Sequence, residues 1–120
     1  MRPLAELQEL MMPKPELEFH TPSAEWSTGG TPGIWDRRLS YDPDTGDATG
    51  LQRYEPGAAS APAVITHDYW EEVILLDGDL YDITAARTFT AGMYACRPPG
   101  MPHGPYRSET GCLMFVTTRY

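Results

Sequence analysis

The chain has 120 residues, enough for one ordinary domain and too few for two. Its 17 acidic and 9 basic residues give a formal net charge of −8, which disfavours nucleic acid and anionic membrane surfaces as partners. No apolar run approaches the roughly 20 residues that span a bilayer. Acidic residues also interrupt the N-terminal segment, where a secretory signal needs an apolar centre. We therefore predict a cytoplasmic protein.

The N-terminal segment shows helical spacing followed by irregular composition. Three apolar residues recur with that spacing before a pair of prolines: Leu4, Leu7 and Met11. They predict a short helix, and the following stretch, rich in Pro, Ser, Thr and Gly, predicts an irregular arm with room for one short strand. We therefore expect an N-terminal helix and arm over residues 1–33 and one folded domain over residues 34–120.

The rest of the chain alternates short strand-like runs with turn residues, which predicts an all-β barrel or sandwich. The expected strands cover residues 34–41, 49–54, 63–67, 72–76, 80–83, 88–90, 93–97 and 112–119. Asp77-Gly78-Asp79 predicts a tight hairpin, because Gly78 adopts positive φ easily. Three prolines between residues 98 and 102 exclude a regular strand there. Cys96 and Cys112 are expected to be reduced thiols buried as small apolar residues.

Two histidines and a carboxylate form a candidate metal-ligand set. His67 precedes Glu71 by four residues, and His103 follows the proline-rich turn. Imidazole and carboxylate together suit a divalent transition metal, and three ligands leave coordination positions open. On residue types alone, Glu71 and Glu72 also fit a solvated hairpin, and His103 fits an ordinary loop histidine. If Glu71 faces inward, strand alternation turns Glu72 outward, and a one-residue slip exchanges the two.

Two segments resemble the sequence motifs of cupins. The second cupin motif has a glycine, five residues, a proline, one residue, a glycine, two residues and a histidine, and these fall on Gly92, Pro98, Gly100 and His103. The stretch from His67 through Glu71 to Gly78 resembles the second half of the first motif. The segment after Pro105 is similar to the cupin domain of ChrR-type anti-sigma factors. The resemblance covers about residue 34 to the C-terminus.

The resemblance implies a single cupin, a double-stranded β-helix or jelly-roll barrel, holding one divalent metal ion through His67, Glu71 and His103. The first motif usually carries two histidines, and the first of them falls here on Ile65, so a four-ligand site becomes a three-ligand site. Fe(II) is the favoured ion, with Zn, Mn or Ni as alternatives. The asparagine that often follows the second motif is Arg107, a cation expected near the mouth.

Aromatic and basic residues around these ligands predict a pocket for a small, partly apolar, anionic or enolisable molecule. Arg97, Tyr69 and Tyr106 are the residues expected to act on the substrate, with Arg97 as its anchor. We expect a metal-dependent cupin enzyme of the dioxygenase type that uses a small aromatic or dicarbonyl-like compound. The alternatives are a lyase, isomerase or cyclase with a Lewis-acid metal, and a sensing module without turnover. Small cupins also resemble homodimers in general, so a homodimer is expected.

Overall fold

The structure is a computed structural model and describes residues 17–120. The helix predicted from Leu4, Leu7 and Met11 lies outside the described residues. Within residues 17–120 the regular elements are all strands, which confirms the all-β prediction. The strands are β1 (Ser27–Thr28), β2 (Ile34–Tyr41), β3 (Ala48–Tyr54), β4 (Trp70–Asp82), β5 (Arg87–Thr90), β6 (Tyr94–Arg97), β7 (Tyr106–Arg107) and β8 (Cys112–Arg119).

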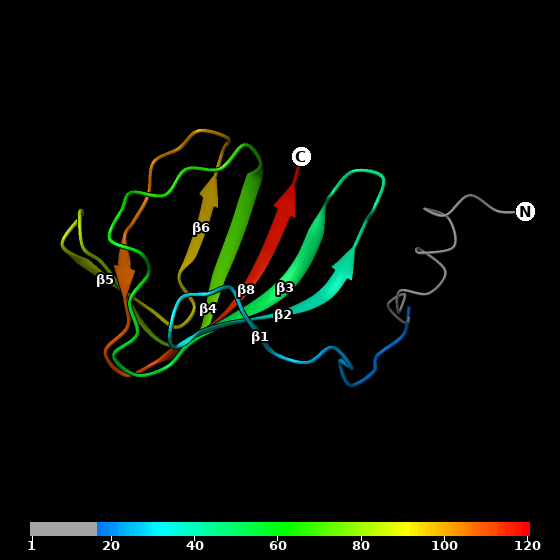
Figure 1. The fold of residues 1–120 in the computed structure, drawn as a ribbon, viewed down its shortest axis with the longest axis horizontal. Coiled ribbons are helices and arrows are strands. Elements are labelled where there is room, and N and C mark those ends of the chain that lie inside the picture. The colour runs from blue at the N-terminus through cyan, green and yellow to red at the C-terminus, as the bar shows by residue number, and fades with distance from the viewer. Residues whose placement is uncertain (1–16) are drawn as a thin grey trace, which may run out of the picture.

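All eight strands join one antiparallel, strongly curved sheet (Figure 1). Along its main path the order is β1-β2-β3-β8-β4-β5, and β6 and β7 also pair with β4. The first half of β4 pairs with β6 and β8, and its second half pairs with β5 and β7. Strand β4 therefore belongs to both walls of the barrel, and the sheet bends around the space between them.

The prediction of a hairpin at Asp77-Gly78-Asp79 is wrong, because these residues lie within β4, a continuous strand of 13 residues. A bulge between Leu75 and Asp77 shifts the register against β8, and Gly78 has a φ of 80°. A Cβ at Gly78 would overlap the backbone carbonyl oxygen of Gly111. The glycine therefore permits a bulge and a close approach between strands, where the sequence indicated a turn.

The strand expected over residues 63–67 is also wrong. This segment forms only an isolated bridge, between Ile65 and His103. Its neighbour is the proline-rich stretch from Pro98 to Pro105, where proline nitrogens have no hydrogen to donate. At the next paired positions, Pro105 has no amide hydrogen and the amide of Met101 donates to the carbonyl of Pro98, so the ladder ends at the bridge.

Alternate residues of the curved sheet face the barrel interior. In β4, Glu71, Val73 and Leu75 are buried, and the intervening Glu72 and Ile74 are less buried. The main core cluster comprises Ile34, Tyr54, Val73, Leu75, Leu80, Tyr106, Cys112 and Met114. Both cysteines are free. Cys112 is buried as predicted, whereas the prediction for Cys96 is wrong, since it lies opposite the outward-facing Glu72 and is exposed.

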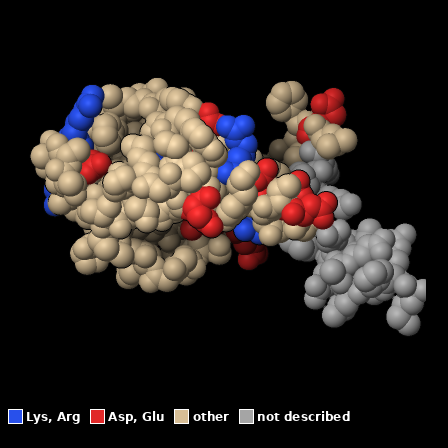
Figure 2. Space-filling view, turned by 90° about the horizontal axis from the view of Figure 1, so that it is seen from above, with Lys and Arg blue, Asp and Glu red and all other residues tan. Residues whose placement is uncertain are grey.

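The described part of the arm runs along β2 and joins the sheet through β1 (Figure 1). Arg37 donates hydrogen bonds to the carbonyl oxygens of Ala24 and Pro22, at 2.7 and 2.6 Å. Trp26 lies under the guanidinium groups of Arg37 and Arg53. Seen from above, the barrel surface is mostly uncharged, and acidic side chains gather toward the arm (Figure 2). No helix in residues 17–120 is long and apolar enough to cross a membrane.

Candidate metal centre

The inward face of β4 places Glu71 in the barrel, in the register that the cupin resemblance implies. Glu71 is 9% exposed and lies opposite Arg97 of β6 and Thr118 of β8. Glu72 points outward, where it pairs with Arg119 at 3.2 Å and accepts a hydrogen bond from the Tyr94 hydroxyl. The two neighbouring carboxylates are therefore on opposite faces of the sheet, and only Glu71 reaches the interior.

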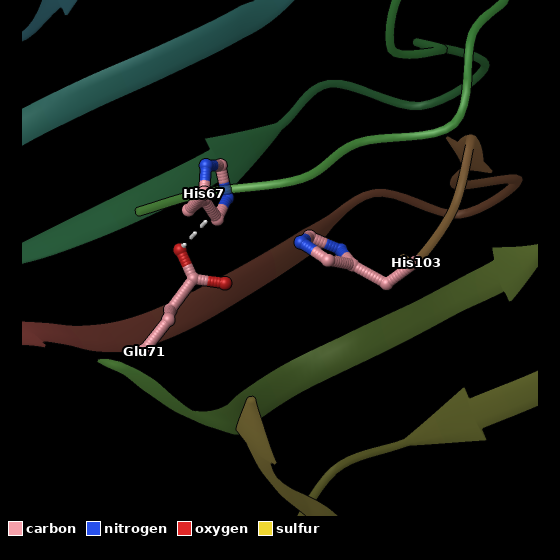
Figure 3. A group of neighbouring side chains, drawn as sticks. All are labelled: His67, Glu71 and His103. Atoms are coloured by element: carbon pink, nitrogen blue, oxygen red, sulfur yellow. Dashed lines mark ion pairs between the residues drawn. The ribbon is translucent and has the colours of Figure 1, made fainter. Parts of the chain in front are cut away.

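Two loops bring the histidines to Glu71. The backbone bridge between Ile65 and His103 joins the segment before His67 to the segment after the proline turn. The amide of Gly100 donates to the carbonyl oxygen of His67 at 2.8 Å and ties the same loops again. The three side chains converge on one point (Figure 3), and each offers a potential ligand atom within 4.8 Å of the others. The structure thus brings together the three residues predicted as ligands.

His103 is a buried imidazole with one partnered and one unpartnered nitrogen. Its Nδ1 lies 3.0 Å from the hydroxyl of Tyr106, and its Nε2 is buried without a hydrogen-bond partner among the described residues. Burial, and next the positive charge of Arg97, lower the pKa of His103 to about 4. The imidazole is therefore neutral near pH 7. A neutral imidazole with a free buried nitrogen is the state that binds a metal ion.

Arg97 links one candidate ligand to the partner of another. Its Nη1 is 2.5 Å from Oε1 of Glu71, and its Nη2 donates to the Tyr106 hydroxyl at 2.8 Å. The other carboxylate oxygen, Oε2, lies 3.6 Å from Nε2 of His67. Arg97 and Tyr106 were candidates from the sequence, but their contacts with Glu71 and His103 were not predicted. The spacing of three residues between His103 and Tyr106 was the available signal, whereas the Arg97 contact follows from the pairing of β4 with β6.

Tyr69 lies against the exposed side of the candidate centre. Its ring stacks on His67 with centroids 4.6 Å apart, and the ring of Tyr120 packs edge-on against it. Burial and the nearby carboxylate of Glu71 raise the pKa of Tyr69 to about 12, so its phenol keeps its proton near pH 7. Tyr69 therefore supports the His67 ring and leaves a neutral hydroxyl beside the centre.

The three candidate ligands and the three residues expected to act on a substrate all line one cavity of about 560 Å³. Apolar side chains, including Ile65, Val73 and Met114, form part of its wall. Arg107 is not among the lining residues. It is largely exposed, lies over the ring of Tyr81 and is 3.7 Å from Glu109. The expectation that Arg107 supplies a cation near the mouth is therefore wrong, because the chain turns this side chain outward in β7.

The donor set fits a divalent transition metal. Two imidazole nitrogens and one carboxylate oxygen are ligands that Fe, Mn, Ni and Zn accept. The unpartnered Nε2 of His103 would otherwise be a polar atom buried without compensation. A bound ion would satisfy it, so the residues present fit a metal centre.

Residues 14–120 match the family described as the ChrR cupin-like domain, a range that begins within the arm. No curated protein sequence matches the chain. An RmlC-like cupin from Shewanella frigidimarina has a TM-score of 0.69 at 19% identity, over 90% of this chain and 94% of that one. An acetylacetone dioxygenase from Acinetobacter johnsonii has a TM-score of 0.69 at 17% identity, over 90% of this chain and 75% of that one.

A chain in the Rhodobacter sphaeroides complex of SigE with the anti-sigma ChrR has a TM-score of 0.62 at 21% identity. The match covers 80% of this chain and 49% of that one. At these identities the solved structures show a common fold, and the family match over most of the sequence shows membership. The chain belongs to the ChrR cupin-like domain family and has the cupin fold.

Proposed function

We propose that this protein is a small metal-dependent cupin enzyme of the non-haem iron dioxygenase type. The observation behind the proposal is the convergence of His67, Glu71 and His103 in one cavity, with a free buried nitrogen on His103. Two histidines and one carboxylate with open positions are the ligand set of many non-haem iron oxygenases. When bound there, Fe(II) would supply Lewis acidity and access to dioxygen.

The cavity favours a small substrate that presents an oxyanion. A divalent ion adds two positive charges, and the Glu71 carboxylate and the Arg97 guanidinium offset each other at 2.5 Å. The centre therefore keeps an excess of positive charge that attracts an enolate or phenolate oxygen. The wall formed by Ile65, Val73 and Met114 suits the apolar part of such a molecule. We propose a small aromatic or dicarbonyl-like compound as the substrate.

Three further side chains complete the proposed site. Arg97 and Tyr106 are hydrogen-bonded to each other beside the ligands, and Tyr69 stacks on His67. All three line the same cavity, so each can contact a bound molecule. A neutral phenol at Tyr69 donates a hydrogen bond to a substrate oxygen without altering the charge of the site. The similarity to the acetylacetone dioxygenase supports the proposal only through the fold.

The family match favours a second candidate, a sensing module that binds a metal and a small ligand without turnover. The matching family is described by its likeness to ChrR, and ChrR is the anti-sigma factor in one of the similar solved structures. A third chemistry, in which Zn or a similar ion polarises a carbonyl for a lyase, isomerase or cyclase reaction, uses the same ligands, since these ligands do not select one metal.

Metal analysis, together with assays of oxygen uptake and product formation, distinguishes these three candidate functions. Protein purified without chelators is analysed for metal and then supplied with Fe(II) and candidate diketones or phenols, while oxygen uptake and product are followed. Oxygen uptake that is lost in His103→Ala and retained in His20→Ala, a control in the arm, supports the dioxygenase. Product without oxygen uptake points to Lewis-acid chemistry. Bound metal without turnover of any compound favours the sensor.

We also propose that the protein is a homodimer in the cytoplasm. The described part of the arm begins with two fully exposed apolar side chains, Leu17 and Phe19. An arm of this length can reach the sheet of a second copy and bury them there. Light scattering should give about twice the chain mass of 13.4 kDa. A mass of one chain at micromolar concentration would reject the dimer.

A further inference from the structure

We propose that Asp36 and Gln52, on the β2–β3 side of the cavity, bind a protonated amine at the end of the substrate opposite its metal-binding oxygen. This inference rests on the proposed function and deepens it, because it assigns the substrate a second polar group. It starts from the cavity lining, which runs from Glu71 in β4 across β8 to Gln52 in β3 and Asp36 in β2.

The cavity has room for more than the metal-binding part of a substrate. Its volume of about 560 Å³ lies within the roughly 300–1,000 Å³ of pockets that enclose drug-sized ligands. Strand β2 is three strands away from β4, which is about 14 Å when measured along the curved sheet. A substrate that reaches from the candidate centre toward β2 is therefore elongated, and its far end lies near side chains other than the candidate ligands.

The amide of Gln52 is oriented by Asp36, its cross-strand partner. Nε2 of Gln52 donates to Oδ1 of Asp36 at 3.0 Å, and this direction is fixed because a carboxylate only accepts. Oε1 of Gln52 and Oδ2 of Asp36 then receive no hydrogen bond from the described residues. Gly29 leaves the space beside Oδ2 open, since a Cβ there would lie 3.7 Å from this oxygen. The pair thus offers two acceptors and one negative charge to a ligand.

The other charged side chains of the cavity lining are engaged elsewhere. Glu71 and Arg97 form an ion pair with each other. Arg37 donates to carbonyl oxygens of the arm, and Arg38 lies over an aromatic ring of its own strand. Asp36 forms no ion pair with any of the residues that the structure describes, so its charge is available to a ligand.

These groups fit a protonated amine better than a hydroxyl or a carboxylate. An ammonium group has three donors, and its hydrogen bond to a carboxylate is charge-assisted and stronger than that of a neutral hydroxyl. The net charge of −8 also favours the approach of a cation over that of an anion. Val73, Val116 and Met114 supply an apolar wall between the two ends. The corresponding substrate has an oxyanion at one end, an apolar middle and an amine at the other end.

The first test compares three catechols that differ only in the group para to one hydroxyl, which is an aminoethyl, a propyl or a carboxyethyl group. Calorimetry measures their binding to Zn²⁺-loaded protein without oxygen, because Zn²⁺ has no redox chemistry that would consume them. We expect the aminoethyl compound to bind about fivefold more tightly than the propyl compound, and the carboxyethyl compound to bind most weakly. Equal affinity for all three would overturn the inference and keep the proposed function. Loaded protein that binds none of them would reject the proposed function, and this inference with it.

The second test changes the charge at Asp36. Asp36→Asn retains an acceptor for Gln52 and should lose the preference for the aminoethyl compound, whereas Asp36→Lys should prefer the carboxyethyl compound. The matched control is Asp44→Asn, which removes an exposed carboxylate in the turn between β2 and β3, outside the cavity lining. It should keep the preference of the wild type. Competition with a chelating dye verifies that each variant binds Zn²⁺ as the wild type does. A preference unchanged in Asp36→Asn would overturn the assignment.

Discussion

Arg97 of β6 and Glu71 of β4 are cross-strand partners, and Nη1 of the arginine lies 2.5 Å from Oε1 of the carboxylate inside the barrel. Both side chains are largely removed from solvent. A carboxylate in such a place needs a compensating charge. Arg97 supplies it on one oxygen and leaves the other for a second partner. The pair therefore makes it feasible to keep the carboxylate of a candidate metal ligand inside the barrel.

Removal of Arg97 should destabilise the fold as well as the site. Arg97→Met leaves Glu71 buried without its partner, and we expect the free energy of unfolding to fall by about 3 kcal/mol. Arg119→Met is the matched control, since it breaks the exposed pair with Glu72 and should cost less than about 1 kcal/mol. Urea denaturation of metal-free protein gives both values. Equal losses in the two variants would show that the buried pair contributes no more to the free energy of unfolding than the exposed pair does.

The two neighbouring glutamates should differ sharply in metal binding. Glu71→Gln removes the inward carboxylate, and we expect Zn²⁺ affinity to fall by more than about tenfold. Glu72→Gln changes a side chain on the outer face that interacts with Arg119 and Tyr94, so affinity should stay within about twofold of the wild type. Dye competition measures both. The opposite order would mean that Glu72 is the ligand and that the register of β4 is shifted by one residue.

Stability of the metal-free protein should depend on pH through His103. Its pKa is about 4 in the folded protein, below the ordinary histidine pKa of 6.5, so the unfolded chain binds more protons between these values. The free energy of unfolding therefore falls as pH decreases from 6.5 toward 4. His103→Gln lacks this contribution, so its loss between pH 7 and pH 5 should be smaller by up to about 2 kcal/mol. Identical pH profiles, measured with urea and a chelator, would contradict a buried neutral imidazole.

The bulge in β4 should depend on Gly78. Gly78→Ala places a Cβ against the carbonyl of Gly111 in addition to the cost of positive φ, and we expect a loss of at least about 3 kcal/mol. Gly92→Ala is the control, because Gly92 also has positive φ but a Cβ there meets no atom within 4 Å. That variant should lose only about 1–2 kcal/mol. Thermal unfolding compares them, and similar losses would argue against close packing at the bulge.

The three candidate ligands that the sequence indicated do converge in the structure, because their placement depends on local spacing. His103 follows a motif whose glycines and prolines bend the chain, and Glu71 follows from alternation along one strand. The hairpin at residues 77–79 failed because a tight turn and a bulge both need glycine at positive φ, and only the partner strand distinguishes them. The strand at residues 63–67 failed because, on either side of the bridge, Pro105 has no amide donor and the amide of Met101 is used within the proline-rich turn.

The contacts around the candidate ligands could not be predicted from the sequence, for a different reason. Glu71 and Arg97 are 26 residues apart, and their contact depends on the register between β4 and β6. No local pattern indicates such a register. The sequence named Arg97 and Tyr106 as candidate site residues, and the structure adds their hydrogen bonds to each other, to Glu71 and to His103.

The most direct test of the metal centre is the metal content of the wild type beside His103→Ala and His20→Ala, all purified without chelators. Mass spectrometry of the metals, normalised to protein, should find about one divalent ion per chain in the wild type and in His20→Ala. His103→Ala should retain little or none, because it loses the buried nitrogen that faces the centre. A wild type without metal, even after incubation with Fe(II) or Zn²⁺, or metal content unchanged in His103→Ala, would contradict a centre formed by His67, Glu71 and His103.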